Sequence, residues 1–201
     1  MPVALGETSY SPPAPQCPPR KRWTREECEA YQRAGFWDGQ HYELINGELI
    51  NKVPKYLPHT LGIRRLVDAL RRVFGADPVL WETSIEVAAE DLRTNEPEPD
   101  VIVLNRSPSE ISGKEPATVD IVLVAEVSDT TLDHDITIKA PLYARAGIPE
   151  YWVLDLNGRR LIVHRAPSGS VYKSVSAYAD NETVAPLTAP DRIISVSDLF
   201  A

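Results

Sequence analysis

Two strongly apolar runs, each flanked by one carboxylate, stand between residues 98 and 128 of this chain. Asp100 precedes the run VIVL, and Glu126 follows the run IVLVA. Short runs this apolar predict strands that are buried on both faces of a sheet. A helix-like segment and a third apolar run, YWVLDL, come next. The stretch therefore predicts an α/β (or α+β) fold with a mixed central β-sheet flanked by helices.

The rest of the chain adds further elements to this core. Thr24 and Glu27 form a capping-box pattern that predicts a short helix. Asn46-Gly47 predicts the turn of a hairpin, and apolar residues at helical spacing predict a long helix after Pro58. More strands are expected around residues 79–82, 84–90, 151–156, 160–166, 171–178 and 183–187, with the last part of the chain closing the sheet edge.

One more helix is expected around Lys139. Pro141 has no N–H and is tolerated only in the first turn of a helix. This helix therefore either begins near Thr137 as its cap or is kinked. Gly147 and Pro149 predict its end.

Composition and charge limit the class of protein. Proline-rich residues 1–20 predict a disordered arm, and residues 21–201 suit a single domain. The two cysteines indicate neither a disulfide framework nor a zinc site. The formal net charge of -8 argues against a protein that coats nucleic acid nonspecifically. No run approaches the roughly 20 apolar residues of a membrane span, and no secretory pattern opens the sequence, so we expect a cytoplasmic protein without a membrane partner.

Asp100, Glu126 and Lys139 are the leading candidates for chemistry. Two carboxylates on adjacent strands can hold a hard divalent ion, and a nearby lysine can steady the charge that develops on a phosphate. The pattern therefore favours metal-dependent phosphodiester hydrolysis. Each residue also has a simpler interpretation: Asp100 marks a strand start, Glu126 belongs to a buried ion pair, and Lys139 pairs with Asp135 on a helix surface.

Other residues give weaker signals. His59 stands at the start of the long helix, where capping is the simpler interpretation. Glu43, in the early hairpin, could supply a further metal ligand, and Tyr143 lies one helical turn after Lys139. The long helix also carries a concentrated basic patch that could contact a DNA backbone: Arg64, Arg65, Arg71 and Arg72.

Taken together, these motifs resemble the Uma-type putative restriction endonuclease family, formerly a domain of unknown function, within the PD-(D/E)xK nuclease superfamily. The resemblance rests on YELINGEL, His59, PDVIVL, AEVSDTT, DITIK and YARAGIPEYWVLD, in this order. It covers nearly all of the chain after about residue 22. The block from Glu126 through Asp155 is its most specific part.

The resemblance implies a restriction-endonuclease-like core, a site that uses Mg²⁺ (or Mn²⁺), and DNA as the substrate. By position, Asp100 and Glu126 would be the metal ligands and Lys139 the catalytic lysine. Ser128 occupies the strand position where the superfamily usually has this lysine, which implies that the lysine has moved to the following helix. The remaining matches are an acidic residue, a histidine and two supports that orient the lysine: Glu43, His59, Asp135 and Tyr143.

Three functions stay open at this stage. The first is an active endonuclease. The second is a nucleic-acid-binding module on the nuclease scaffold that does not cleave, and the third is a structural or interaction protein. A homodimer is expected by analogy, because two-fold symmetry suits the cutting of two strands.

Overall fold

The computed structural model describes residues 20–52 and 56–200, and within them a mixed six-stranded sheet forms the centre of the fold. Its strands are β3 (Val79–Trp81), β4 (Val101–Leu104), β5 (Ile121–Ser128), β6 (Glu150–Asp155), β7 (Arg160–Ser168) and β8 (Val171–Ala179), adjacent in that order. Strands β5 and β6 are parallel, and all other neighbouring pairs are antiparallel. The predicted fold class is confirmed.

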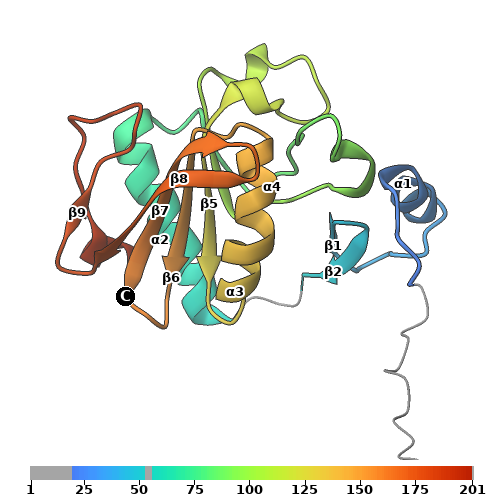
Figure 1. Ribbon diagram of the computed structural model, residues 1–201, viewed down its shortest axis with the longest axis horizontal. Helices are drawn as coiled ribbons and strands as arrows, with labels where there is room; N and C mark the ends of the chain where they lie inside the picture. The colour runs from blue at the N-terminus through green and yellow to red at the C-terminus, as the bar shows by residue number, and fades with distance from the viewer. Residues whose placement is uncertain (1–19, 53–55, 201) are drawn as a thin grey trace, which may run out of the picture.

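Helices cover both faces of this sheet (Figure 1). Helix α2 (Leu57–Phe74) lies behind the strands in that view, whereas α3 (Leu132–His134) and α4 (Ala140–Arg145) lie in front of them. Helix α1 (Arg25–Arg33) stands to one side and begins with the expected capping box of Thr24 and Glu27. In the described part of the chain, no helix combines the length and the apolar character that a membrane crossing requires. The short 3₁₀ turns are Leu92–Thr94, Pro108–Glu110, Thr118–Asp120 and Val196–Leu199.

Successive residues of each central strand point to opposite faces and build two apolar layers. On β4, Val101 and Val103 belong to one layer, and Ile102 and Leu104 belong to the other. The layer packed on α2, called the α2 face, includes Leu66, Leu70, Val101, Val103, Leu123 and Trp152. The layer packed on α4, called the α4 face, includes Ile102, Leu104, Val124, Leu142, Tyr143 and Tyr151.

Two small sheets accompany the central one. Strands β1 (Tyr42–Ile45) and β2 (Glu48–Asn51) form the predicted hairpin, in which Asn46 and Gly47 adopt φ values of 49° and 74°. Left-handed values at both positions match the tight hairpin turn that the Asn-Gly pair predicts. Strands β9 (Thr183–Val184) and β10 (Ile194–Ser195) pair with each other. The sheet edge is therefore closed by β8, and residues 183–187 do not join it, contrary to expectation.

The helix around Lys139 begins earlier than a Thr137 cap would allow. A π-helical turn, Asp135–Lys139, joins α3 to α4. Pro141 explains this turn, because it has no N–H to donate to the preceding helical turn. Just before it, the Ala140 N–H donates to the carbonyl of Asp135, five residues back. The distortion expected from Pro141 is thus a widened turn inside a longer helical segment.

The strand expected over residues 84–90 does not form. Ile85 is fully buried, but its N–H donates to the carbonyl of Pro97, and the Glu86 N–H donates to the carbonyl of Pro116. Proline cannot return the second hydrogen bond of a regular ladder, so alternating apolar residues here pack as loop. The predicted proline-rich arm lies outside the described residues, apart from position 20.

Candidate active site

The pairing of β4 with β5 brings the two predicted metal ligands together. Val101 pairs with Ala125, so Asp100 and Glu126 occupy the next positions of the two strands. The Val127 N–H donates to Asp100 Oδ2 at 2.8 Å, and the Asp100 N–H donates to Glu126 Oε2 at 3.4 Å. Both carboxylates are buried, at 5% and 3% exposure. The strands thus hold two acidic groups side by side away from bulk water.

Lys139 reaches this pair from the helix on the α4 face. Its Nζ lies 2.9 Å from Glu126 Oε1 and 2.9 Å from Glu43 Oε1. The Tyr143 hydroxyl, one turn later, donates to the same Glu126 oxygen at 3.0 Å. Lys139 is only 5% exposed, so the interpretation of this residue as half of a surface pair with Asp135 is wrong.

Glu43 enters the site from the β1–β2 hairpin. Its carboxylate accepts a hydrogen bond from the Glu98 N–H at 3.0 Å, besides its ion pair with Lys139. The neighbouring Leu44 exchanges backbone hydrogen bonds with Glu96 in both directions. The hairpin is therefore attached to the segment that leads into β4, and this attachment places Glu43 in the pocket.

Asp135 and His59 stand beside this cluster. The Ser128 and Thr131 hydroxyls donate to Asp135 Oδ2 at 2.5 and 2.8 Å. His59 Nε2 lies 3.5 Å from Asp100 Oδ2, and Tyr56, not His59, is the N-cap of α2. The capping interpretation of His59 is therefore wrong. Its Nδ1 is buried without a hydrogen-bond partner in the described part of the chain.

Burial and crowding of negative charge dominate the electrostatics. Burial raises the pKa of Glu126 to about 8, with Lys139 opposing the shift and Asp100 adding to it. Burial alone would lower the pKa of Lys139, but the adjacent Glu126 and Glu43 carboxylates outweigh it and raise that pKa well above its usual value. Burial also raises the pKa of Asp135. Among the described residues, the Lys139 ammonium thus pairs with two carboxylates, and this concentration of acidic groups suits a cation.

These groups line one pocket of about 240 Å³. Sequence reasoning missed Lys52, whose Nζ donates to the Glu98 carbonyl at 2.6 Å. It also gave no role to His134, whose Nε2 is buried without a hydrogen-bond partner among the described residues. Neither has a motif spacing that could have revealed it. The charged and histidine side chains of the lining are Glu43, Lys52, His59, Asp100, Glu126, Asp129, His134, Asp135 and Lys139.

The pocket offers two carboxylates to a metal ion, not a full protein cage. Across residues 20–52 and 56–200, no group of three or more His, Cys, Asp or Glu side chains has an arrangement that would hold one. Mg²⁺ commonly binds through one or two carboxylates, with waters and substrate phosphate completing its shell. Asp100 and Glu126 fit that mode, because both are oxygen donors of the hard type that Mg²⁺ prefers.

The predicted basic patch lies on α2, outside this pocket. Arg64 Nε is 3.9 Å from Asp68, and Arg65 donates to the Phe200 carbonyl at 2.9 Å. The Arg71 guanidinium lies over the Trp81 ring. None of these arginines, nor Arg72, is among the residues that line the pocket of Asp100. The structure does not bring the basic patch and the carboxylates into one cavity.

Comparison with known proteins identifies a family and a solved structure of similar fold. The profile of the Uma2 family, described as "Putative restriction endonuclease", matches residues 26–197. A crystal structure from Anabaena variabilis, titled as "a putative nuclease belonging to DUF820", has a similar fold, with a TM-score of 0.59 and 18% identity. That match covers 79% of this chain and 89% of the other. No curated protein matches the chain significantly.

Proposed function

Since this chain belongs to the Uma2 family, described as "Putative restriction endonuclease", we propose that it is a metal-dependent endonuclease that hydrolyses phosphodiester bonds of DNA. The observation that carries the proposal is the meeting of Asp100, Glu126 and Lys139 in one buried pocket, from two strands and a helix. These are the three groups that two-carboxylate phosphodiester hydrolysis requires.

Asp100 and Glu126 would hold the ion, with Mg²⁺ as the expected metal and Mn²⁺ as a substitute. When bound, such an ion lowers the pKa of a water molecule and offsets charge on the scissile phosphate. The Val127 N–H fixes the orientation of Asp100, and the Tyr143 hydroxyl fixes that of Glu126. Both carboxylates are thus oriented before substrate arrives, which reduces the reorganisation needed during reaction.

Lys139 is the group that stabilises negative charge on the attacked phosphate. Its raised pKa keeps the ammonium protonated at neutral pH, so it acts as a fixed cation and not as a base. Glu43 pairs with the ammonium as Glu126 does, which makes Glu43 a positioning residue. Asp135 and Tyr143 support the same helical segment through Ser128, Thr131 and Glu126.

A non-cleaving module that binds nucleic acid or another partner is the second candidate. One observation favours it: Glu126 Oε1 already accepts from Lys139 and Tyr143, and Oε2 accepts from the Asp100 N–H. A carboxylate so engaged can serve as the centre of a structural ion cluster. Metal binding and cleavage distinguish the two functions.

Calorimetric titration with Mg²⁺ tests the metal site first. Saturable binding is expected for the wild type and should disappear in Asp100→Asn/Glu126→Gln. Asp129→Asn is the matched control, because Asp129 lines the same pocket but is not a proposed ligand. Equal binding in the double variant and the wild type would contradict the assignment of the ligands.

Cleavage of DNA substrates with Mg²⁺ tests the reaction. Lys139→Ala should lower the rate by about 10²–10³-fold, the usual effect of removing one charge-stabilising group, and should retain DNA binding. Lys52→Ala is the matched control, since Lys52 lines the same pocket but is paired with Glu98. Binding without cleavage in every variant, the wild type included, would favour the second candidate.

We also propose a homodimer, since cutting both strands of a duplex is simplest with two copies related by a two-fold axis. Light scattering on the full chain tests this assembly. A monomer at the concentrations used for cleavage would contradict it.

A further inference from the structure

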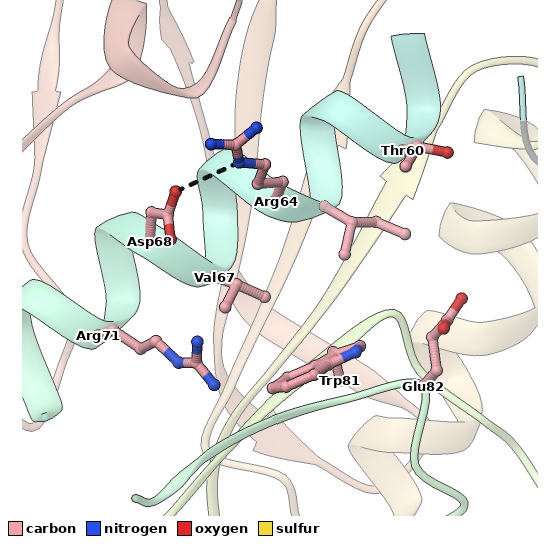
Figure 2. A pocket seen from close by; sticks show the side chains of 8 residues that line it. Thr60, Arg64, Val67, Asp68, Arg71, Trp81 and Glu82 are labelled. Atoms are coloured by element: carbon pink, nitrogen blue, oxygen red, sulfur yellow. Dashed lines mark ion pairs between the residues drawn. The ribbon is translucent and has the colours of Figure 1, made fainter. Parts of the chain in front are cut away.

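A second pocket, of about 340 Å³, lies between α2 and the end of β3 (Figure 2). We call it the Trp81 slot. A volume of this size falls within the range of ordinary small-ligand sites, about 300–1,000 Å³. The function proposed above assigns it no role. Its lining residues are Thr60, Ile63, Arg64, Val67, Asp68, Arg71, Trp81 and Glu82.

Trp81 gives the slot an exposed aromatic wall. It is the last residue of the edge strand β3 and is 47% exposed. The next residue, Glu82, has φ 48°, a left-handed conformation that costs a non-glycine residue about 1–2 kcal/mol. Figure 2 shows Val67 and Arg71 of α2 directed toward the Trp81 ring, with Glu82 beyond its other end. The indole thus forms one side of the slot, and α2 forms the other.

Two arginines supply donors at this wall. The Arg71 Cζ lies 4.8 Å from the centre of the Trp81 ring. Its Nε is buried without a hydrogen-bond partner among the described residues, a costly state unless a ligand supplies an acceptor. Arg64 has a side chain that is 76% exposed and pairs with Asp68 at 3.9 Å. Arginine donors beside an aromatic face suit a phosphate that carries a planar, stacking group.

The charges of the slot favour a nucleotide over a bare polyanion. Arg64 and Arg71 are offset by Asp68 and Glu82, so the lining is not strongly basic. A carboxylate can accept hydrogen bonds from the amino groups of a base, and the aliphatic side chains of Ile63 and Val67 can cover its other face. Stacking surface, donors and acceptors are therefore present together.

The slot adjoins the pocket that holds the carboxylates. The Glu82 N–H donates to the carbonyl of Asp100 at 3.1 Å. On α2, His59 lines the first pocket and the next residue, Thr60, lines the slot. The two cavities therefore adjoin at the first turn of α2, and a backbone hydrogen bond connects Glu82 of the slot to Asp100 of the first pocket. A strand whose phosphate lies at Asp100 would carry a neighbouring nucleotide past the slot.

We propose that the Trp81 slot binds the base of an unpaired nucleotide of the substrate strand, stacked on the indole with its phosphate against Arg71. This inference rests on the proposed function and names its substrate class: single-stranded DNA, or DNA with an unpaired base beside the scissile phosphate. A base inside an intact duplex is already stacked on both faces and cannot enter a slot between a ring and a helix.

The test measures binding of the full-length protein in the presence of a chelator, so that no cleavage occurs. Three labelled probes of equal length are compared: a single strand, its duplex, and a strand of abasic residues that keeps every phosphate. The wild type should bind the single strand more tightly than the other two. Trp81→Ala should lose about 5- to 150-fold in affinity for the single strand, the usual effect of removing one stacked base, and only slightly weaken binding of the abasic strand.

Matched variants separate stacking from folding and from charge. Trp81→Phe should retain most of the affinity, because a phenyl ring still stacks. Phe36→Ala removes another exposed aromatic side chain, on a different part of the molecule, and should change nothing. Arg71→Gln should weaken binding of the single strand more than Arg72→Gln, which removes the same charge from the next residue of α2.

The outcomes are distinct. An equal loss on the single strand and on the abasic strand would overturn base stacking, as would unchanged binding by Trp81→Ala or the absence of DNA binding. If cleavage depends on Lys139 and Trp81→Ala binds DNA like the wild type, the proposed role of the Trp81 slot is contradicted and the proposed nuclease activity is supported. If binding depends on Trp81 but neither the wild type nor any variant cleaves DNA, the role of the slot is supported and the proposed nuclease activity is contradicted.

Discussion

Two buried glutamates lie on neighbouring strands of the sheet and have opposite electrostatic surroundings. Glu150, on β6, is 1% exposed; it accepts from Arg165 Nε and Nη2 at 2.8 and 2.6 Å, and from the Trp152 indole at 2.9 Å. Its other oxygen accepts from the Leu187 N–H at 2.7 Å. One guanidinium thus balances one carboxylate in charge, and both carboxylate oxygens have hydrogen-bond donors.

Glu126, on β5, shares the Lys139 ammonium with a second carboxylate. Lys139 lies between Glu126 and Glu43, and Asp100 and Asp135 add further negative charge nearby. A buried carboxylate by itself therefore does not indicate function. A matched carboxylate stabilises the fold, whereas an excess of carboxylates over cations leaves a requirement that a bound cation can meet.

Glu150→Gln should have the largest effect on stability. The variant leaves the Arg165 guanidinium without its counter-ion, so we expect the free energy of unfolding to fall by about 3–5 kcal/mol. Urea unfolding measures this loss. The affinity for Mg²⁺ should be unchanged. A loss below about 1 kcal/mol would show that Glu150 and Glu126 do not differ as described.

Mg²⁺ should stabilise the wild type by about 2.7 kcal/mol at a concentration of 100 times its Kd. The same substitution at the other glutamate, Glu126→Gln, should abolish this gain. The metal-free stability of that variant at neutral pH should stay within about 1 kcal/mol of the wild type, because the pKa of Glu126 is raised to about 8 and the uncharged glutamine replaces a largely protonated carboxyl. Urea unfolding with and without Mg²⁺ provides both values. A gain retained by Glu126→Gln would place the metal elsewhere.

Above the Glu126 pKa of about 8, Tyr143→Phe should cost about 1.5–3 kcal/mol, because its hydroxyl then donates to a charged carboxylate. Burial raises the pKa of Tyr143 well above its usual value, so this donor stays protonated. Tyr172→Phe is the matched control on the same face: its hydroxyl donates to the neutral Ile148 carbonyl at 2.9 Å, and about 0.5–1.5 kcal/mol is expected. Equal losses in the two variants would indicate that Glu126 carries little charge.

His164 should give the smallest effect, a dependence of stability on pH. Burial lowers its pKa below the usual 6.5, so the unfolded chain takes up the proton first as the pH falls. The contribution of neutral His164 is therefore complete above pH 6.5 and is lost as the pH falls toward the folded-state pKa, with a slope of at most about 1.4 kcal/mol per pH unit. The groups packed on its ring are Tyr151 and Tyr172, whose pKa values are raised, so both stay neutral there.

His164→Phe should remove this slope and leave the stability above pH 7 nearly unchanged. Urea midpoints measured between pH 5 and pH 8 provide the comparison. A slope retained by the variant would assign the pH dependence to the acidic cluster of Glu126 instead.

The sequence predicts on which strand or helix a site residue lies. It does not predict the contacts that segments far away in the chain make with that residue. Asp100 could be located because it precedes a buried strand, Glu126 because it follows the apolar run that begins β5, and Lys139 because it lies in the next helical segment. The burial and ion pairing of these side chains could not be predicted in the same way. The burial of Lys139 depends on Glu43, whose hairpin lies almost a hundred residues away and is attached through Glu96.

The failures have the same origin. Residues 84–90 alternate as a strand does, but their partners are the prolines at 97 and 116, which no local pattern reveals. Trp81 looks like an ordinary strand residue, and Arg71 like one charge of a solvated helix face. Only the packing of α2 beside β3 makes a slot from them. Local periodicity thus predicts helices and strands but not the cavities that form between them.

The π-helical turn between α3 and α4 sets the rotation of Tyr143 relative to Asp135. Each residue of an α-helix advances the chain by about 100°, and a turn with one residue too many changes the rotational phase of everything after it. Asp135 belongs to the phase fixed by the loop after β5, whereas Tyr143 belongs to the phase fixed by α4. Removing one residue from this turn would therefore rotate Tyr143 by about 100° relative to Asp135 and take its hydroxyl away from Glu126.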